Sequence, residues 1–482
     1  MPYIQKHSVN QFEAGCLDEQ IKENNPVRLY RLVSDLYVSS NAEKLGIKEV
    51  KSSGRPEYHP SDMLCLFLYG YINRISSSRL LEKECHRNIE VQWFMGHLTP
   101  DHWTINNFRR NNGGLISGLI IQFRKFLKEQ KLIDGVMVMV DGTKLKANNQ
   151  KDMLKKTELR DMVRRGEESI SRYLEDMERM DRLEEEEDRL EEIQEERERL
   201  SKELEELKRK TGEQKRLYEK AKAEGVKYLG TTDKDSRLML SRNGKVPGFN
   251  AQFAVDSKNH LIVGNSVTNE AVDKHQLKPM VEGLVSEDIP LQRVVADKGY
   301  STLDEIQQIE EERSVECVVG IIKTPRGDEE NFRYDRQKDE YVCPMGKRLT
   351  LLQKGNKSRK DNASIYLCRE CAGCPIGESC TKSKRGRIVN RRENQEWRDA
   401  YKERMKLEEN KNLLVRRKGV IEHVFGTIKL YMGAVPLLLR GMKGVRTEMD
   451  LYVQAYNFIR VLNIFEFNDL MRKIADFDWK MA

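Results

Sequence analysis

No stretch of this 482-residue chain approaches the roughly 20 consecutive apolar residues that a membrane-spanning helix needs. The opening residues, MPYIQKHSVNQFEAG, also lack the apolar core of a signal peptide. The phosphate-binding pattern G-x₄-G-K-[ST] is missing too, which argues against a nucleotide-driven enzyme. We therefore expect a soluble, cytoplasmic protein that uses neither a membrane nor a nucleotide cofactor.

The nine cysteines are too unevenly spread for a disulfide framework, which an intracellular chain rarely builds. Four are scattered and five cluster: Cys343, Cys368, Cys371, Cys374 and Cys380. The spacing C-x₂-C-x₂-C-x₅-C, with one cysteine further upstream, predicts a tetrahedral thiolate site for Zn²⁺. One thiol is surplus to such a site, and reduced cysteines without metal are the alternative.

The chain is too long for one ordinary core, so we expect two or three domains. Charged residues make up 34% of the chain but the net charge is only +7, so the distribution is more informative than the sum. Acid is concentrated in Glu184–Glu206, whereas Lys347–Arg392 and Arg416–Lys418 are basic. These basic segments suit a phosphate backbone, although basic residues can also merely solvate a surface.

One short apolar run stops at an acidic residue. Gly135–Lys146 reads GVMVMVDGTKLK, and its five apolar residues, β-branched at alternate positions, predict a strand buried on both faces. We expect this strand to end at Asp141, at the rim of a sheet, where open α/β folds place their ligands. Asp-Gly is also a turn dipeptide, so a turn or cap aspartate is the alternative.

Two further acids complete a candidate set. In Arg293–Ser301 a short strand, Val294–Ala296, is followed by Asp297. In Arg416–Leu430 the apolar residues follow helical spacing and leave Glu422 on another face. Carboxylates from two strands and a helix form an all-oxygen site that suits Mg²⁺ or Mn²⁺. Two such ions, about 3.5–4 Å apart, would serve an in-line displacement at phosphorus.

Six segments together resemble a known family. They are, in chain order, HPSDMLCLFLYGYINRISSSRLLE, PDHWTINNFRR, VDGTKLKAN, PGFNAQFAVD, VVADKGYS and IEHVFGTIK. Their order and joint presence resemble the DDE transposases of bacterial insertion sequences, over most of the chain. The resemblance implies a mixed α/β fold, with a ribonuclease H-like catalytic domain and an all-helical N-terminal domain. It also implies a prokaryotic protein that is associated with the nucleoid when bound to DNA.

The resemblance implies four catalytic residues, of which the first three bind two Mg²⁺ or Mn²⁺ ions: Asp141, Asp297, Glu422 and Lys429. Related enzymes carry a Tyr, Arg, Glu, Lys signature around the glutamate. Here Val415 stands in place of the tyrosine and Lys418 in place of the arginine, with Arg417 as the nearest substitute.

The resemblance also favours one zinc ligand set among the clustered cysteines: Cys343, Cys371, Cys374 and Cys380, with Cys368 as the alternative ligand. Basic residues in three regions are expected to contact DNA: Arg79, Arg109, Arg110, Lys382, Lys384, Arg385, Arg387, Arg417 and Lys418.

Residues 1–132 read as short helices that would form a DNA-binding domain, although an ordinary helical bundle fits the pattern equally well. Trp93 and Trp103 are expected in its core rather than stacked on bases. The catalytic domain would be built from three segments: 133–150, 226–330 and 396–470. Within it, Gly248–Asp256 and His260–Thr268 predict a β-hairpin.

Two insertions interrupt the catalytic domain. Residues 151–225 hold almost no Gly or Pro and predict a long helix or a helical hairpin. Its apolar seam consists of Leu183, Leu190, Ile193, Leu200, Leu204 and Leu207. This seam would pack either on a second protomer or within the chain. Residues 331–395 would form the basic, zinc-binding Cys-rich insertion.

Together these patterns predict a transposase that binds insertion-sequence ends in double-stranded DNA as a homodimer or larger assembly. It would cleave and transfer DNA strands by metal-dependent transesterification. A ribonuclease H-like nuclease that cuts without joining is one alternative. A domesticated DNA-binding protein without transposition activity is the other.

Overall fold

The computed structural model describes residues 15–47, 57–148, 153–184, 190–241, 244–322, 332–355 and 362–481. The chain divides into two compact units, and each is described by itself. The first unit comprises Met1–Asp273, Glu282–Pro290 and Val420–Ala482, and the second comprises Lys274–Val281 and Leu291–Gly419. Both units combine helices with strands, so the mixed α/β class is confirmed.

Helices open the first unit: α1 (Leu17–Gln20), α2 (Pro26–Ser40), α3 (Pro60–Ile72), α4 (Ser78–Arg87), α5 (Ile89–Met95), α6 (His102–Asn111) and α7 (Gly113–Glu129). The start of α3 follows from its sequence, because Pro60 fits the first helical turn and the His59 ring accepts the Ser61 N–H. Its apolar run is buried on every side. On α7, the Phe123 ring stacks on Phe458 of α15 (Gly441–Ile464), with ring centroids 4.5 Å apart.

The sheet of the first unit is antiparallel. It contains β1 (Met137–Lys146), β4 (Arg237–Ser241), β5 (Gly244–Asp256) and β6 (Ile262–Thr268). β5 pairs with β1 along one edge and with β4 and β6 along the other. The predicted hairpin of two successive strands is confirmed by β5 and β6.

β1 is longer than the sequence predicts. The apolar run stops at Val140, but the strand continues because Asp141–Lys146 pair with Phe253–Gly248 of β5. The prediction that the strand ends at Asp141 is therefore wrong, and Asp141 lies near the middle of β1. The polar residues can continue the strand because alternate side chains point to opposite faces, and one face carries a buried polar cluster that accommodates them.

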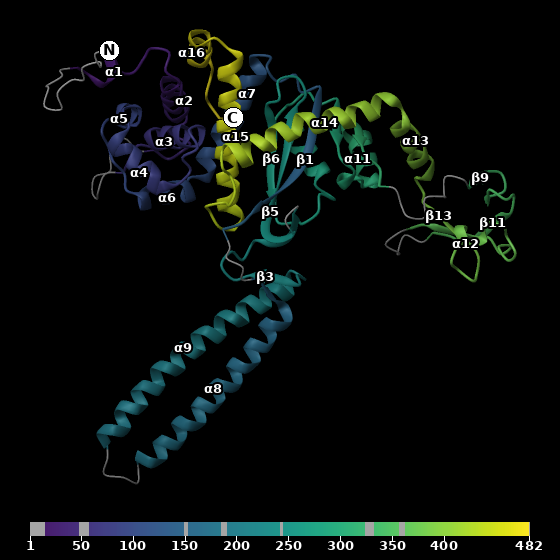
Figure 1. The fold of residues 1–482 in the computed structure, drawn as a ribbon, viewed down its shortest axis with the longest axis horizontal. Helices are drawn as coiled ribbons and strands as arrows, with labels where there is room; N and C mark the ends of the chain where they lie inside the picture. The colour runs from purple at the N-terminus through teal and green to yellow at the C-terminus, as the bar shows by residue number, and fades with distance from the viewer. Residues whose placement is uncertain are drawn as a thin grey trace, which may run out of the picture. The chain divides into compact units, whose positions relative to one another are not determined.

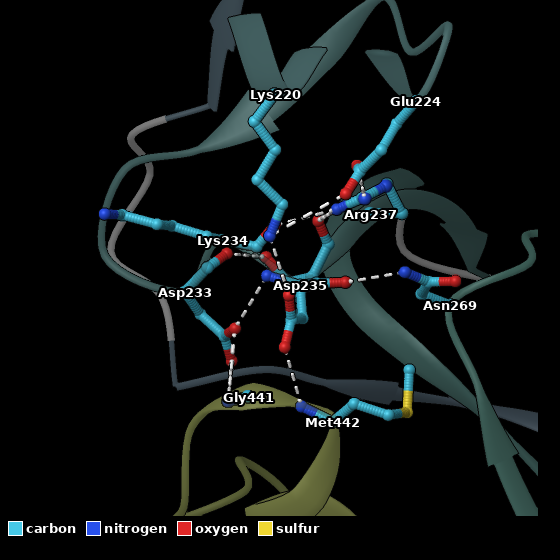
Figure 2. A network of polar contacts seen from close by, with 10 residues as sticks. Lys220, Glu224, Asp233, Lys234, Asp235, Arg237, Asn269, Gly441 and Met442 are labelled. Atoms are coloured by element: carbon cyan, nitrogen blue, oxygen red, sulfur yellow. Dashed lines mark hydrogen bonds and ion pairs between the residues drawn. The ribbon is translucent and has the colours of Figure 1, made fainter. Parts of the chain in front are cut away.

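α15 and α16 (Phe467–Asp476) complete the first unit. The first N–H groups of a helix need acceptors from outside it, and for α15 two aspartates from a distant loop supply them. Asp233 accepts from Gly441 N–H at 3.2 Å, and Asp235 accepts from Met442 N–H at 3.0 Å. Lys220 Nζ donates to the other oxygen of Asp235 at 2.9 Å, so the loop is tied to a further helix as well (Figure 2).

That further helix belongs to a helical hairpin. The strands β2 (Met153–Lys155) and β3 (Tyr228–Gly230) pair at its base, and α8 (Lys156–Glu184) and α9 (Leu190–Ala223) lie side by side (Figure 1). Tyr173 donates from its hydroxyl to Glu203 at 2.9 Å, which fixes the antiparallel register of the two helices.

The apolar seam of the hairpin packs within the chain at Leu204. Leu204 is buried, and Leu200 and Leu207 are half-buried. The side chains of Leu183, Leu190 and Ile193 lie outside the described residues. For Leu204 the structure therefore follows the alternative in which the seam packs inside one chain.

In the second unit, β7 (Arg293–Ala296) and β8 (Glu316–Val319) are parallel neighbours. η1 (Lys298–Tyr300) and α11 (Leu303–Arg313) connect them. α13 (Gln395–Lys406) packs here, because Val319 N–H donates to the buried Tyr401 hydroxyl at 3.0 Å. α10 (Leu277–Ser286) and α14 (Glu408–Gly426) each run from one unit into the other.

The Cys-rich segment of the second unit has its own small sheet, in the order β13-β12-β11-β10-β9. Its elements are β9 (Arg333–Asp335), β10 (Glu340–Val342), β11 (Arg348–Gln353), β12 (Ser364–Leu367), α12 (Gly377–Cys380) and β13 (Ile388–Arg391). Its core is thin and is built mainly on Tyr341, Leu349, Tyr366 and Cys368.

Candidate active site and nucleic-acid interface

Asp141 lies half-buried in the middle of β1, and its carboxylate accepts the Gly142 N–H at 2.8 Å. Its partner on β5 is Phe253. Directly paired residues of antiparallel strands point to the same face, so the Asp141 carboxylate and the Phe253 ring share one face of the sheet. Gly142 and Lys144 point to the opposite face.

α14 packs on the face that carries Asp141. The Phe425 ring contacts Phe253, with centroids 5.8 Å apart, and Glu422 lies one turn before Phe425. The predicted apolar side of this helix is confirmed, since Val420, Ile421, Val424 and Ile428 are buried, whereas Glu422 is exposed. The structure thus brings the helix of Glu422 over the strand of Asp141.

The helix changes pitch just after Glu422. α14 ends at Gly426, and a π-helical turn, η3 (Thr427–Tyr431), follows. Single π-helical turns occur frequently at functional sites. Lys429 lies in this turn and donates from Nζ to the carbonyl oxygen of Lys144 at 3.1 Å. Lys429 is therefore also held against β1, only three residues beyond Asp141.

Asp297 is the first residue after β7, as the sequence predicts. It is half-buried, and its side chain accepts the Gly299 N–H at 2.7 Å, which caps η1. Asp141 and Glu422 belong to the first unit, whereas Asp297 belongs to the second. In the part of the chain that the structure describes, no group of three or more His, Cys, Asp or Glu is arranged to hold a metal ion. The donor chemistry of three carboxylates nevertheless suits Mg²⁺ or Mn²⁺.

Behind Asp141, on the opposite face of the sheet, lies a polar cluster that sequence reasoning missed. Asp273 Oδ1 accepts three hydrogen bonds: from Lys144 Nζ at 2.9 Å, from Asn250 Nδ2 at 2.8 Å and from Gln252 Nε2 at 2.8 Å. Asn250 and Gln252 are fully buried. The only signal in the sequence was the pair of amides at alternate positions of an otherwise apolar strand.

The cluster explains why a glycine follows Asp141. A Cβ at position 142 would lie 2.4 Å from Asp273 Oδ1 and 2.4 Å from Gln252 Nε2. Burial alone would raise the pKa of Asp273, but hydrogen bonds from Asn250 and Lys144 outweigh it and hold that pKa below its usual value. The carboxylate is thus kept charged directly behind the strand of Asp141.

The five clustered cysteines line one small cavity of the second unit. Cys368 is buried in the core, and the other four are half-buried around it. Cys343 Sγ accepts the Lys347 N–H at 3.3 Å, and Cys371 Sγ accepts the Arg387 N–H at 3.3 Å. Burial raises the pKa of Cys368 to about 11. The thiols therefore converge and already receive backbone donors, although they are not in a metal-binding arrangement.

The cations predicted to contact DNA fall into two groups. Those exposed at the surface are Arg79, Arg110, Lys382, Lys384, Arg385 and Lys418. Arg109, Arg387 and Arg417 are buried. Arg109 donates to the Tyr71 hydroxyl at 2.8 Å and to the Ser76 carbonyl at 3.0 Å, and Arg387 donates to the Cys380 carbonyl at 2.8 Å. Because burial removes these three side chains from solvent, we leave them out of the proposed DNA interface.

Two family models match the chain. The first, described as a transposase domain (DUF772), matches residues 15–111. The second, described as a transposase DDE domain, matches residues 342–462, a region that includes both the cysteine cluster and Glu422. No curated protein and no solved structure matches the chain. In the residues that the structure describes, no helix is long and apolar enough to cross a membrane.

These matches support a transposase function, and the DDE domain implies a transposition enzyme with a DNA substrate. More closely, they indicate an insertion-sequence DDE transposase, the family that the sequence motifs resemble.

Proposed function

We propose that this transposase binds the ends of its insertion sequence, cleaves DNA strands there and joins them to a target, through Asp141, Asp297 and Glu422. The observation that carries the proposal is the packing of α14 on the Asp141 face of the sheet, with Phe425 against Phe253. Asp141 and Glu422 are far apart in the sequence, but α14, which carries Glu422, packs on the sheet that contains the strand of Asp141. A ribonuclease H-like arrangement of the catalytic domain is part of the proposal.

The donor set consists of carboxylate oxygens, and it would hold two Mg²⁺ or Mn²⁺ ions. When bound, these ions supply an activated water or 3′-hydroxyl and neutralise charge on the leaving oxygen. The chain itself positions the strand carboxylate: the sheet formed by β1 and β5 packs on α14 through Phe253 on one face, and Lys144 of β1 is bonded to Asp273 on the other. Lys429, held at the Lys144 carbonyl, would contact a phosphate near the scissile bond.

The test is a gel assay with duplexes that carry the terminal DNA of the element. A transposase needs Mg²⁺ or Mn²⁺ to cut these ends, and it also joins pre-cut ends with a free 3′-hydroxyl to a second duplex. Cutting without joining would favour the nuclease of the same fold. End binding without metal-dependent cutting would favour a DNA-binding protein that has lost transposition activity.

We further propose that the Cys-rich segment binds one Zn²⁺, through Cys343, Cys371, Cys374 and Cys380, with Cys368 as the alternative ligand. Five converging thiols form a soft donor set that suits zinc. Backbone N–H donors to Cys343 and Cys371 are the kind of supporting contact that ligands of a metal receive. When bound, zinc would replace a hydrophobic core that this segment largely lacks.

The zinc proposal is tested by metal analysis of protein purified without added zinc, where one equivalent per chain is expected. The double variant Cys371→Ser/Cys374→Ser should lose the metal and become sensitive to limited proteolysis within 331–395. Cys16→Ser, at an exposed cysteine outside the cluster, is the matched control. Wild-type protein with well under one equivalent would contradict the proposal.

The remaining assignments concern assembly and DNA contact. We propose that residues 1–132 and the exposed strip Lys382, Lys384 and Arg385 contact the phosphate backbone, and that the protein acts as a homodimer or larger assembly on DNA. Removal of α8 and α9, with β2 and β3 joined by a short Gly/Ser linker, tests the role of the hairpin. Light scattering with and without end DNA should show weaker assembly, and thermal melting should show that the rest of the chain still folds. An unchanged oligomer would favour a hairpin whose seam packs only within one chain, as it does at Leu204.

A further inference from the structure

Trp103 contradicts the expectation that it belongs to the core. Its side chain is 68% exposed, whereas Trp479 is buried and Trp93 and Trp397 are at most half-exposed. Trp103 is the second residue of α6, and the Asp101 side chain caps that helix by accepting the Thr104 N–H at 2.7 Å. An exposed Trp ring can serve an interface, where Trp is enriched because it is apolar and carries one hydrogen-bond donor.

One face of α6 is buried against the other helices, and the opposite face is accessible to solvent. Ile105 and Arg109, four residues apart, are buried, and Arg109 is bonded into the helical core through Tyr71. The other side carries the exposed Trp103 and Arg110 with the half-buried Asn107 between them, at the helical spacing i, i+4 and i+7. An amide and a guanidinium on one helix face are the two groups that best recognise adenine and guanine in the major groove.

α4 lies antiparallel beside α6 (Figure 1), because the His102 ring contacts Glu82 at 2.9 Å and Arg109 donates to the Ser76 carbonyl at 3.0 Å. Its exposed residues are Arg79, Leu80, Lys83, His86 and Arg87.

The two most central acids of α4, Glu82 and Glu84, form contacts with residues of α4 and α6. Glu82 contacts His102, and the buried Glu84 is paired with Arg87. Arg79 and Lys83, four residues apart, therefore form a basic stripe along the exposed side of α4. A basic stripe beside a helix face with hydrogen-bonding groups is complementary to duplex DNA, in which phosphates flank the groove.

We propose that α6 is the helix that reads base sequence, with Asn107 and Arg110 on base edges and Trp103 against an apolar base surface, while Arg79 and Lys83 contact phosphates. The occupant of this face is double-stranded DNA. The inference rests on the proposed function and deepens it, because it assigns the discrimination of element ends to one helix face. It resembles the arrangement in which one helix enters the major groove and its neighbour crosses the backbone.

The first test is selection from a random-sequence duplex library. The wild type should enrich one motif. Asn107→Ala and Arg110→Ala should each lower the preference for that motif roughly tenfold or more, at positions specific to each variant. Lys258→Ala, at an exposed lysine outside residues 1–132, is the matched control and should enrich the wild-type motif. Thermal melting verifies that the variants are folded.

The second test separates phosphate contact from base reading. Arg79→Ala and Lys83→Ala should weaken binding equally on selected and unselected DNA, and each should lower the salt dependence of log K by about one. Trp103 supplies a spectroscopic readout, since selected DNA should quench wild-type emission and Trp103→Phe should lose that quenching. A Trp93→Phe variant should keep it.

Two outcomes overturn the assignment. In one, the wild type enriches a motif and the Asn107 and Arg110 variants enrich the same motif with the same strength. In the other, the wild type enriches no motif at all. The proposed function is judged independently, because metal-dependent cutting and joining of pre-cut ends are measured at protein concentrations that saturate the DNA. Wild-type protein that cuts and joins these ends but enriches no motif would overturn the assignment and leave the proposed function standing.

Discussion

α14 and α15 are long helices of the C-terminal part, and each carries a glutamate in a different environment. Glu448 on α15 is fully buried, and its carboxylate accepts the N–H groups of Leu438 and Leu439 at 2.8–3.0 Å. Glu422 on α14 is exposed on a helix whose other side is buried. An acid whose oxygens are bonded to backbone donors holds the fold, whereas an exposed acid on a helix that packs on the sheet of Asp141 can serve chemistry.

The two environments also differ in electrostatics. Burial raises the pKa of Glu448, against the opposing effects of Arg109 and of the backbone donors. Removing a carboxylate from water is costly unless hydrogen bonds compensate. Glu448 can therefore be buried because backbone N–H groups donate to its carboxylate. The comparison therefore predicts that mutations at the two glutamates have opposite phenotypes.

The largest effect is expected at the three proposed catalytic acids. Asp141→Asn, Asp297→Asn and Glu422→Gln should each lower strand cleavage and joining by about a thousandfold or more, because an amide cannot replace a charged metal ligand. For Glu422→Gln, the free energy of unfolding should change by no more than about 0.5 kcal/mol, since the side chain is exposed.

A gel assay and urea unfolding measure the two effects. Glu408→Gln, at an exposed glutamate near the start of the same helix, is the matched control and should retain full activity. Joining close to the wild-type rate by any of the three acid variants would remove that residue from the active site.

Glu448 should show the converse. Glu448→Ala leaves the buried Leu439 N–H and the part-buried Leu438 N–H without this acceptor and should lower the free energy of unfolding by about 3 kcal/mol. Strand cleavage per folded molecule should be retained at low temperature. Urea unfolding measures the loss, and Glu448→Gln should lose less because its amide oxygen still accepts one N–H. A loss below about 1 kcal/mol for the alanine variant would show that these backbone groups find other acceptors.

Periodicity and strand-turn patterns predicted much of the scaffold. The apolar positions Val420, Ile421, Val424 and Ile428 identified the buried side of α14, and the strand before Asp297 ends as expected. These features depend on local spacing, which the sequence contains directly. The packing of α14 on β5 depends on a contact between Phe425 and Phe253, which no local pattern could reveal.

Local patterns could not resolve the places where distant residues decide burial or pairing. Arg109 and Arg110 are adjacent arginines on one helix, yet Tyr71 and the Ser76 carbonyl engage only the first, so the first is buried and the second is exposed. The end of β1 was misplaced for a similar reason. A count of apolar residues stops at Asp141, whereas the strand continues because its polar residues pair with β5, and Lys144 finds a part-buried acceptor in Asp273.

A smaller effect is expected from glycine substitutions on the far side of the sheet from Glu422. Gly142→Ala should lower the free energy of unfolding by about 1–3 kcal/mol, because its Cβ would be forced against Asp273 and Gln252. Gly283→Ala, in α10 with open space around it, is the matched control and should be neutral or stabilising by up to about 1 kcal/mol. Equal unfolding midpoints for the two variants would show that the polar cluster moves aside without cost.

The smallest effect concerns the charge of Asp273, which extends the comparison of buried and exposed acids to pH. Hydrogen bonds from Asn250 and Lys144 overcome the burial that would raise its pKa, and they hold the pKa below its usual value. A carboxyl group whose pKa is lower in the folded than in the unfolded chain stabilises the fold above its usual pKa. That stabilisation is lost as the pH falls through the lowered folded-state pKa.

Asp273→Asn should therefore lower the free energy of unfolding by about 1 kcal/mol at pH 7, where the ion pair with Lys144 is intact in the wild type. The difference between wild type and variant should be constant from pH 5 to pH 8, the range above the usual carboxyl pKa of about 3.9. This difference should shrink below about pH 4, as the wild-type carboxylate takes up its proton.

Urea unfolding across this pH range measures the difference in unfolding free energy, and Asp134→Asn, at an exposed aspartate, should give no difference at any pH. A difference that is the same at pH 3 and pH 7 would mean that the geometry of the acceptor, and not its charge, supports the strand behind Asp141.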